Sequence, residues 1–258
     1  LLELDNIVVS PHLGANTYES QYNIGTQAAE NAIEAAKGIA YPHAMNLPID
    51  ESKIPSFVKP FLEMGQKIGF LVSQINKSQI IAIKVSGQGE IAQYVDSLST
   101  FVAVGAMSQN SGDTINYVNA EFVAKEKGID IESESLVDSS VFKNLITIKL
   151  TTAEGTTTVS ATIFDDGVKR IVAIDGFDIE VPLKGDMILF KNSDVPGVIG
   201  SIGSTLANHN VNIADFSLAR DEHSQALAVI LVDNSVDDIT LNELSSLEAC
   251  LSVSYAKL

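Results

Sequence analysis

The chain has 258 residues, 45% of which are apolar, so it is long enough to bury the core of one large domain or two smaller ones. Its formal net charge is −17 at pH 7. A surface of this sign repels a phosphate backbone or an anionic membrane, since such partners select Lys and Arg. We therefore expect neither a nucleic acid nor a membrane among its partners.

The cysteine and histidine content limits the metal chemistry and the compartment. The chain has a single cysteine, Cys250, which excludes an internal disulfide and a cysteine-based zinc site. The histidines form no pair with metal-ligand spacing, and no apolar run approaches the ~20 residues of a membrane helix. We expect a soluble, cytoplasmic protein without a metal site.

Residues 8–14 combine a strand pattern, a histidine and a tight turn. The β-branched pair Val8 and Val9 favours a strand, and Gly14 marks a turn after it. His12 thus follows a strand, at the kind of rigid edge where catalytic groups are displayed. A structural loop histidine is the open alternative, because histidine is polar, adaptable and common at strand ends.

A helix and a connector complete the first block of the chain. Residues 17–37 carry apolar side chains at helical spacing, and Asn16 or Thr17 can cap the helix. A proline-rich segment follows over residues 41–55. We place a domain boundary in this segment, so that the first block covers residues 1–48.

The middle block, residues 49–184, alternates between helical and strand periods. The predicted helices cover residues 56–74, 91–107 and 115–127. The predicted strands cover residues 80–85, 145–150, 156–164 and 170–174. A hairpin turn is predicted at residues 165–167, which read Asp-Asp-Gly. We expect a mixed α and β domain whose sheet is built mainly from the late strands.

The last block, residues 185–258, has a regular order of elements. The predicted strands cover residues 187–191, 211–219, 226–232 and 251–255. The predicted helices start at residue 198 and span residues 236–247. The order βαββαβ is typical of the ferredoxin-like arrangement, with two helices on one face of an antiparallel sheet.

One glycine pattern imitates a dinucleotide-binding fingerprint. Residues 87–92, GQGEIA, follow a strand and precede a helix, as the pattern G-x-G-x-x-A does. That fingerprint also needs a second parallel strand with an acidic residue about 20 positions on, and this distance falls in a polar turn here. We expect instead that the strand ends at Gly87 and that a turn begins a structural helix.

Glycines also crowd the start of the helix at residue 198. Gly197, Gly200 and Gly203 lie three positions apart, so they can line one helix face and allow it to pack closely on the sheet. Gly197 has a second possible use, because without a Cβ it lets a small anion reach the free N–H groups. The positive end of the helix dipole favours that anion.

Asp194 and Asn212 place a charge and an amide near this helix. Asp194 suits a cationic amine, the helix start suits a carboxylate, and the amide of Asn212 serves either group. In a βαββαβ fold, the two residues come from opposite ends of one helix. A ligand that touches both kinds of position would therefore lie between two copies of the chain.

Five stretches spread along the chain carry a more specific pattern. They read SPHLGANTYESQYNIGTQAAENA, GIAYPHAMN, YVNAEFVAKEKGI, KRIVAIDGFDIE and DVPGVIGSIGSTLANHNVNIADFSLAR. In residues and in order, the chain resembles the D-3-phosphoglycerate dehydrogenases, which are NAD-dependent 2-hydroxyacid dehydrogenases. The resemblance implies an α+β or α/β chain in three parts. These are an end piece of the catalytic core, a mixed α/β intervening domain and a ferredoxin-like ACT domain.

The resemblance gives the first block a catalytic role in the whole enzyme. It implies that His12 is the base that takes the hydroxyl proton of 3-phosphoglycerate, while hydride passes to NAD. The product would be 3-phosphooxypyruvate, for L-serine biosynthesis. By the same resemblance, His12, Leu13, Gly14 and Ala15 line the nicotinamide. We expect the 258 residues alone to bind no NAD and to be inactive, since the fingerprint and the substrate arginine of the family lie elsewhere.

The resemblance gives the last block an effector site. It implies that Asn192, Asp194 and Asn212 contact L-serine between two ACT domains, together with the turn that precedes the helix. That turn consists of Val195, Pro196 and Gly197. The intact protein would then be a homo-oligomer held by its ACT and intervening domains.

The resemblance also points to an anion site in the intervening domain of some relatives. Arg170 matches one of its basic positions, but Asp178 and Pro182 stand where further basic residues are expected. Anion binding should be weakened on charge grounds. We expect this domain to act mainly as a scaffold and interface.

Two other classes of protein stay open at this point. An intervening domain joined to an ACT domain also occurs in iron–sulfur L-serine dehydratases, whose catalytic part needs clustered cysteines and gives no reason for the SPHLG stretch. A free-standing amino-acid-binding protein would begin with methionine and carry no orphan strand. We expect the carboxyl-terminal portion of a longer dehydrogenase.

Overall fold

The computed structural model describes residues 6–36, 54–111, 115–136 and 141–258. The chain separates into two units, residues 1–47 and residues 48–258, and each is described by itself. In the first unit, helix α1 (Tyr18–Ala36) confirms the predicted helix. The Thr17 hydroxyl oxygen accepts a hydrogen bond from the Ser20 backbone N–H at 3.1 Å, so Thr17 caps it.

The strand predicted at Val8 and Val9 is wrong. Both residues are irregular, and the Val8 side chain is 98% exposed. β-Branched residues favour strands only where a neighbouring strand accepts and donates their backbone hydrogen bonds, and the described part of this unit offers none. Most of the predicted connector lies outside the described residues.

The first sheet of the second unit has six strands in the order β2-β1-β3-β4-β5-β6. Strands β1 and β2 are parallel, and the other neighbours are antiparallel. The strands are β1 (Ile80–Gly89), β2 (Asp130–Ser135), β3 (Asn144–Thr152), β4 (Thr156–Ile163), β5 (Lys169–Ile174) and β6 (Phe177–Pro182). The predicted hairpin turn joins β4 to β5, with Gly167 at a φ of 78°.

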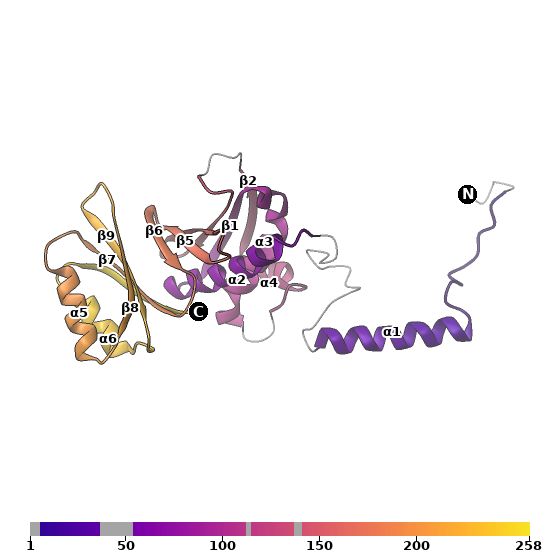
Figure 1. Ribbon diagram of the computed structural model, residues 1–258. Helices are drawn as coiled ribbons and strands as arrows, with labels where there is room; N and C mark the ends of the chain where they lie inside the picture. The colour runs from indigo at the N-terminus through magenta and orange to yellow at the C-terminus, as the bar shows by residue number, and fades with distance from the viewer. Residues whose placement is uncertain (1–5, 37–53, 112–114, 137–140) are drawn as a thin grey trace. The chain divides into compact units, whose positions relative to one another are not determined.

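Four helical segments accompany this sheet, and Figure 1 shows α2 and α3 against one of its faces. They are α2 (Val58–Ile75), the 3₁₀ helix η1 (Glu90–Tyr94), α3 (Val95–Ser111) and α4 (Ala120–Glu126). The predicted helix at residues 115–127 is thus shorter than expected, because Asn116 and Asn119 form side-chain hydrogen bonds to the backbone before it. In the described ranges, no helix is both long and apolar enough to cross a membrane.

Glycines let the backbones of α2 and α3 approach closely. A Cβ added to Gly69 would lie 2.2 Å from the Val102 carbonyl oxygen, and one added to Gly105 would lie 2.0 Å from that of Gln66. Real Cβ atoms do not come so near a carbonyl oxygen, so both positions require glycine. The distance between α2 and α3 in the core is therefore set by these two glycines.

The second sheet confirms the predicted βαββαβ order. Its strands are β7 (Asp186–Ser193), β8 (Ile213–Arg220), β9 (Gln225–Val232) and β10 (Cys250–Lys257). They lie in the antiparallel order β10-β7-β9-β8. The helices are α5 (Val198–Asn208) and α6 (Asp238–Ser245), which Figure 1 shows next to each other on one side of the sheet.

The expected close packing of the α5 glycines on this sheet is wrong. A Cβ added to Gly200 or Gly203 would meet no atom within 4 Å. Ile202 and Leu206 are fully buried, and they hold the helix face that packs on the sheet. Because these larger residues fill that face, the glycines lie toward open space.

Strands β7 and β9 are buried on both faces, which explains why their sequences do not alternate. Leu189 and Val229 belong to the core shared with α2 and the six-stranded sheet. Their neighbours Ile188 and Ile230 belong to the core under α5 and α6. A strand covered on both sides reads as a continuous apolar run. The two sheets of this unit therefore share one core.

The hydroxyl of Tyr255 joins β10 to β7 by donating to the Asp186 carboxylate at 2.7 Å. Burial, followed by the contact with Asp186, raises the pKa of Tyr255 to about 12 from its ordinary value of 10.0. Folding thus favours the neutral phenol. The stability from this contact is complete below pH 10.0 and is lost as the pH rises to about 12.

A Tyr255→Phe variant tests this alkaline loss. We expect the free energy of unfolding of the unmutated chain, measured with urea, to fall more steeply between pH 10.0 and about 12 than that of the variant. The variant has no phenol to ionise. Lysines titrate in the same range in both proteins, so the difference between the two curves isolates Tyr255. Parallel curves would contradict the assignment.

Candidate functional site

A cavity of about 350 Å³ lies beside the turn between β7 and α5. It is bounded by the end of β7, the first turns of α5, the end of β8 and the start of β9. Its lining includes Asn192, Asp194, Gly197, Ile199, Leu218 and Arg220. Most of the effector residues expected from the sequence thus surround one hollow in a single copy of the chain.

The turn is shaped by Gly197, which stands at the start of α5 with a φ of 96°. This left-handed conformation favours glycine, although a Cβ would meet no atom within 4 Å. No side chain caps α5, so its first N–H groups are left for another acceptor. Val195 and Pro196 line the cavity and also a second hollow on the side of Leu247.

Asp194 and Arg220 form an ion pair in the lining. The Asp194 Oδ2 atom lies 3.2 Å from the Arg220 Nε atom, and their side chains are 30% and 66% exposed. The Asp194 backbone N–H donates to the Ser224 carbonyl at 2.9 Å, so the turn is tied to the β8–β9 hairpin. This backbone hydrogen bond holds the Asp194 carboxylate near the guanidinium of Arg220, which lies at the end of β8.

Asn192 contributes an unsatisfied acceptor. It is 2% exposed, and its Nδ2 donates to the Ser193 carbonyl at 2.7 Å. The buried Oδ1 atom accepts no hydrogen bond from any residue that the structure describes. Since buried polar atoms are nearly always paired, this oxygen is free to accept from a bound molecule.

Asn212 lies away from this cavity. Its amide Nδ2 donates to the Asp233 carboxylate at 2.6 Å, and the residue is exposed. It is absent from the described lining of the cavity. This separation agrees with the expectation that one copy does not bring Asn212 to Asp194. A contribution from the Asn212 of a second copy stays a prediction.

Arg220 is the residue that the sequence analysis did not assign. It ends β8, opposite Ala226 in the hairpin that faces the turn. One signal was present, because Arg170 and Arg220 are the two arginines of a strongly acidic chain. The sequence alone could not predict that Arg220 pairs with Asp194, because the pair forms only when the β8–β9 hairpin packs beside the turn before α5.

The first block shows the predicted turn, on which the residues expected to bind the cofactor lie. The Asn16 backbone N–H donates to the Leu13 carbonyl at 3.1 Å. His12, Leu13 and Gly14 are exposed and Ala15 is half-buried. In the described part of this unit these residues form an open turn, and their contact with a nicotinamide ring stays a prediction.

The glycines of the apparent fingerprint allow other backbone segments of the chain to pack closely against them. β1 runs on through Gly87 and ends at Gly89, so the strand is longer than predicted. A Cβ on Gly89 would lie 2.0 Å from the Lys143 carbonyl oxygen, and one on Gly87 would lie 3.0 Å from the Ala92 Cα atom. The parallel strand β2 does follow, but the space beside the glycines is filled by backbone.

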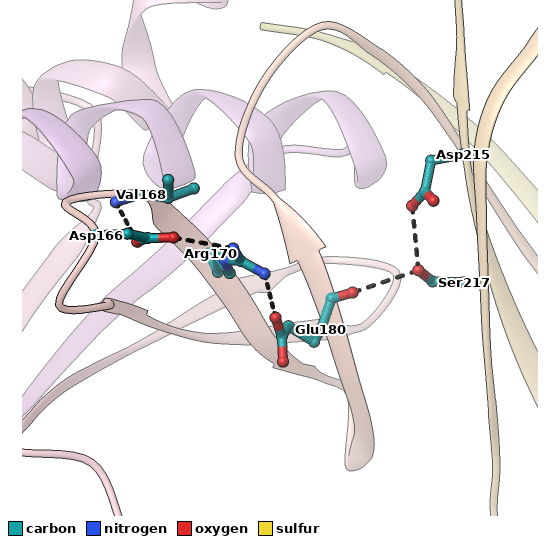
Figure 2. A network of polar contacts seen from close by, with 6 residues as sticks. All are labelled: Asp166, Val168, Arg170, Glu180, Asp215 and Ser217. Atoms are coloured by element: carbon teal, nitrogen blue, oxygen red, sulfur yellow. Dashed lines mark hydrogen bonds and ion pairs between the residues drawn. The ribbon is translucent and has the colours of Figure 1, made fainter.

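The positive charge of Arg170 is balanced by two nearby carboxylates. Figure 2 shows its guanidinium between the carboxylates of Glu180 and Asp166, the latter at 3.2 Å. The guanidinium also lies 5.0 Å from the centre of the Phe164 ring. Two carboxylates leave little positive potential for an anion, and weakened anion binding here stays a prediction. The Glu180 carbonyl accepts from the Ser217 hydroxyl of β8 at 3.3 Å.

Comparison with known proteins assigns both parts of the second unit. Residues 57–175 match the D-3-phosphoglycerate dehydrogenase intervening domain, and residues 187–249 match the ACT domain.

Named relatives match nearly the whole chain. It is 33% identical to D-3-phosphoglycerate dehydrogenase of Bacillus subtilis (strain 168), over 96% of the chain and 47% of that protein. It is 32% identical to the enzyme of that name from Synechocystis sp., over 95% of the chain and 45% of the relative. For Archaeoglobus fulgidus the identity is 30%, over 100% of the chain and 50% of the relative. The chain spans about half the length of these relatives, and it belongs to the D-3-phosphoglycerate dehydrogenase family.

Proposed function

We propose that these residues are the regulatory part of an NAD-dependent D-3-phosphoglycerate dehydrogenase, and that the cavity beside α5 binds L-serine. The observation that carries this proposal is the cavity itself. It combines the Asp194 carboxylate, the uncapped start of α5 and the unpaired Asn192 Oδ1 atom. These groups match the ammonium, carboxylate and hydroxyl of a small hydroxylated amino acid.

Each group of L-serine finds a partner of suitable chemistry in this cavity. A carboxylate accepts from an ammonium by charge-assisted hydrogen bonds, which are stronger than neutral ones. The first N–H groups of α5 and the positive end of its dipole favour the ligand carboxylate. The Asn192 Oδ1 atom accepts from the ligand hydroxyl. The aliphatic walls, such as Ile199 and Leu218, suit the short apolar part of a small amino acid.

A second copy of the chain completes the site in this proposal. Asn212 lies outside the cavity of its own copy, one residue before the edge strand β8. An edge strand has free backbone groups that can pair with another chain. A homo-oligomer would thus add an amide to the effector site and link ligand binding to assembly.

The dehydrogenase reaction is proposed for the whole enzyme and not for these residues alone. In that enzyme, His12 would take the hydroxyl proton of 3-phosphoglycerate, and NAD would supply the hydride acceptor. The exposed turn that carries His12 offers no substrate clamp in the part of the first unit that the structure describes. The proposal therefore assigns catalysis to the whole enzyme, in which further residues would hold the substrate and NAD.

L-serine is expected to raise the melting temperature of the chain, and Asp194→Ala to abolish that rise. A ligand at a hundred times its Kd adds ~2.7 kcal/mol to the free energy of unfolding. The ammonium loses its counter-charge in the variant. The measurement is a thermal melt followed by circular dichroism, with and without L-serine.

Asp238→Ala is the matched control, because Asp238 is an exposed carboxylate in the same domain, in the first turn of α6. It should keep the full L-serine shift. An unmutated chain that melts at the same temperature with and without L-serine would contradict the proposed effector.

A further inference from the structure

The Asp194–Arg220 ion pair occupies the place where the charges of a ligand would bind. Both side chains line the cavity, and the Asp194 Oδ2 atom lies 3.2 Å from the Arg220 Nε atom. Arg220 is 66% exposed, so its guanidinium is still largely hydrated. Exposed ion pairs contribute little to stability, because water and salt screen them. A ligand can therefore separate this pair at small cost.

The backbone on both sides of the pair is held in place. Asp221 accepts hydrogen bonds from the backbone N–H groups of His223 and Gln225, at 2.9 and 2.8 Å, which fixes the β8–β9 hairpin. The Asp194 N–H donates to the Ser224 carbonyl of the same hairpin. Only the side chains of the pair need to move when a ligand enters, while the distance between their Cα atoms is kept.

A zwitterion is the charge complement of this pair. Its ammonium replaces the guanidinium on Asp194, and the released guanidinium takes the carboxylate of the ligand by a charge-assisted contact. Neither protein charge is then left without a partner. An amine without a carboxylate would leave Arg220 without a counter-charge. A hydroxy acid without an amine would compete for Arg220 and leave Asp194 without a counter-charge.

We propose that Arg220 is a specificity-determining residue of this cavity. It holds Asp194 in the empty site and binds the α-carboxylate of the effector in the filled one, so that the cavity selects α-amino acids over amines and hydroxy acids. This inference rests on the proposed effector function of the cavity. It gives Arg220 a part in binding the ligand carboxylate, which the N–H groups at the start of α5 would otherwise bind alone.

The test compares ligands that differ by one charged group, by isothermal titration calorimetry on the full chain. The ligands are L-serine, 2-aminoethanol, which lacks the carboxylate, and 3-hydroxypropanoate, which lacks the amine. We expect Arg220→Gln to weaken L-serine binding by about tenfold to a hundredfold, which is the range for contacts with charged groups. The same variant should bind 2-aminoethanol more tightly, because Asp194 has lost its competitor.

Arg170→Gln is the matched control, since Arg170 is the other arginine of the chain and pairs with Glu180 and Asp166 on the six-stranded sheet. It should bind all three ligands as the unmutated chain does, and Arg220→Lys should recover part of the L-serine affinity. The opposite signs for L-serine and 2-aminoethanol cannot come from a misfolded cavity.

Three results would overturn the inference. If Arg220→Gln binds L-serine as tightly as the unmutated chain does, Arg220 is not a ligand group, while the effector proposal stands. If the variant loses L-serine and 2-aminoethanol equally, its role is structural. If the unmutated chain binds no L-serine, the effector proposal itself fails and this inference fails with it.

Discussion

Gly105→Ala is expected to lower the free energy of unfolding by about 2 to 3 kcal/mol, the upper part of the range for overpacking a core. The new Cβ would lie 2.0 Å from the Gln66 carbonyl oxygen and 3.0 Å from the Phe70 backbone nitrogen. Both are backbone atoms of α2, so no side chain can rotate away, and α2 and α3 must separate. This cost exceeds the ~1 kcal/mol that alanine gains over glycine in a helix.

Gly203→Ala is the matched control for this prediction. It is the same substitution in a helix, but its Cβ meets no atom within 4 Å, and Gly203 is not part of the cavity lining. The free energy of unfolding should rise by about 0.5 to 1 kcal/mol, because only the helix propensity changes. Urea unfolding followed by circular dichroism measures both. A rise in the free energy of unfolding of both variants would show that the α2–α3 contact is looser than these distances indicate.

The opposite behaviour of these glycines also shows where prediction from sequence succeeds. The spacing of three positions in α5 predicted a packed glycine face, but apolar residues at Ile202 and Leu206 take that face. The glycines that do allow close packing, Gly69 and Gly105, lie in the helices predicted over residues 56–74 and 91–107, for which no glycine packing was predicted. Glycine spacing alone does not tell which backbone approaches, because that depends on the partner helix.

The two missed strands differ in how far the sequence could reveal them. β6 alternates strictly, with Phe177, Ile179 and Val181 buried and the residues between them exposed, so its period of two was available. β2 reads DIESES and is mostly exposed. Acidic residues disfavour strands, and β2 exists because it pairs in parallel with β1 at the sheet edge. That pairing is a tertiary effect.

The candidate site follows the same division. The turn, the helix start and Asp194 follow from local composition, since glycine before an apolar helix marks its N-terminus. The opposing Arg220 comes from the other end of a hairpin, and the unpaired Oδ1 atom of Asn192 follows from burial. Non-local contacts of this kind need the sheet order, which local periodicity does not give.

Val229→Asp is expected to lower the free energy of unfolding by about 4 kcal/mol or more, because it places a carboxylate in an apolar core without a partner. Val229 is fully buried in the core that β9 shares with α2 and the six-stranded sheet. Folded domains have free energies of unfolding of only ~5 to 15 kcal/mol, so this change removes a large part of the total. Urea unfolding monitored by circular dichroism measures the loss.

Ile239→Asp separates burial from charge in this experiment. It adds the same carboxylate to α6, where Ile239 is 68% exposed, and the first turn of a helix favours a negative charge. Its effect should stay within about 0.5 kcal/mol. Since Val229 lies on the sheet face away from α5 and α6, equal midpoints for the two variants would mean that this face is open to water. A large loss confined to Val229→Asp would instead mean that this face of the ACT sheet is buried against α2 and the six-stranded sheet, so that the two domains stabilise each other.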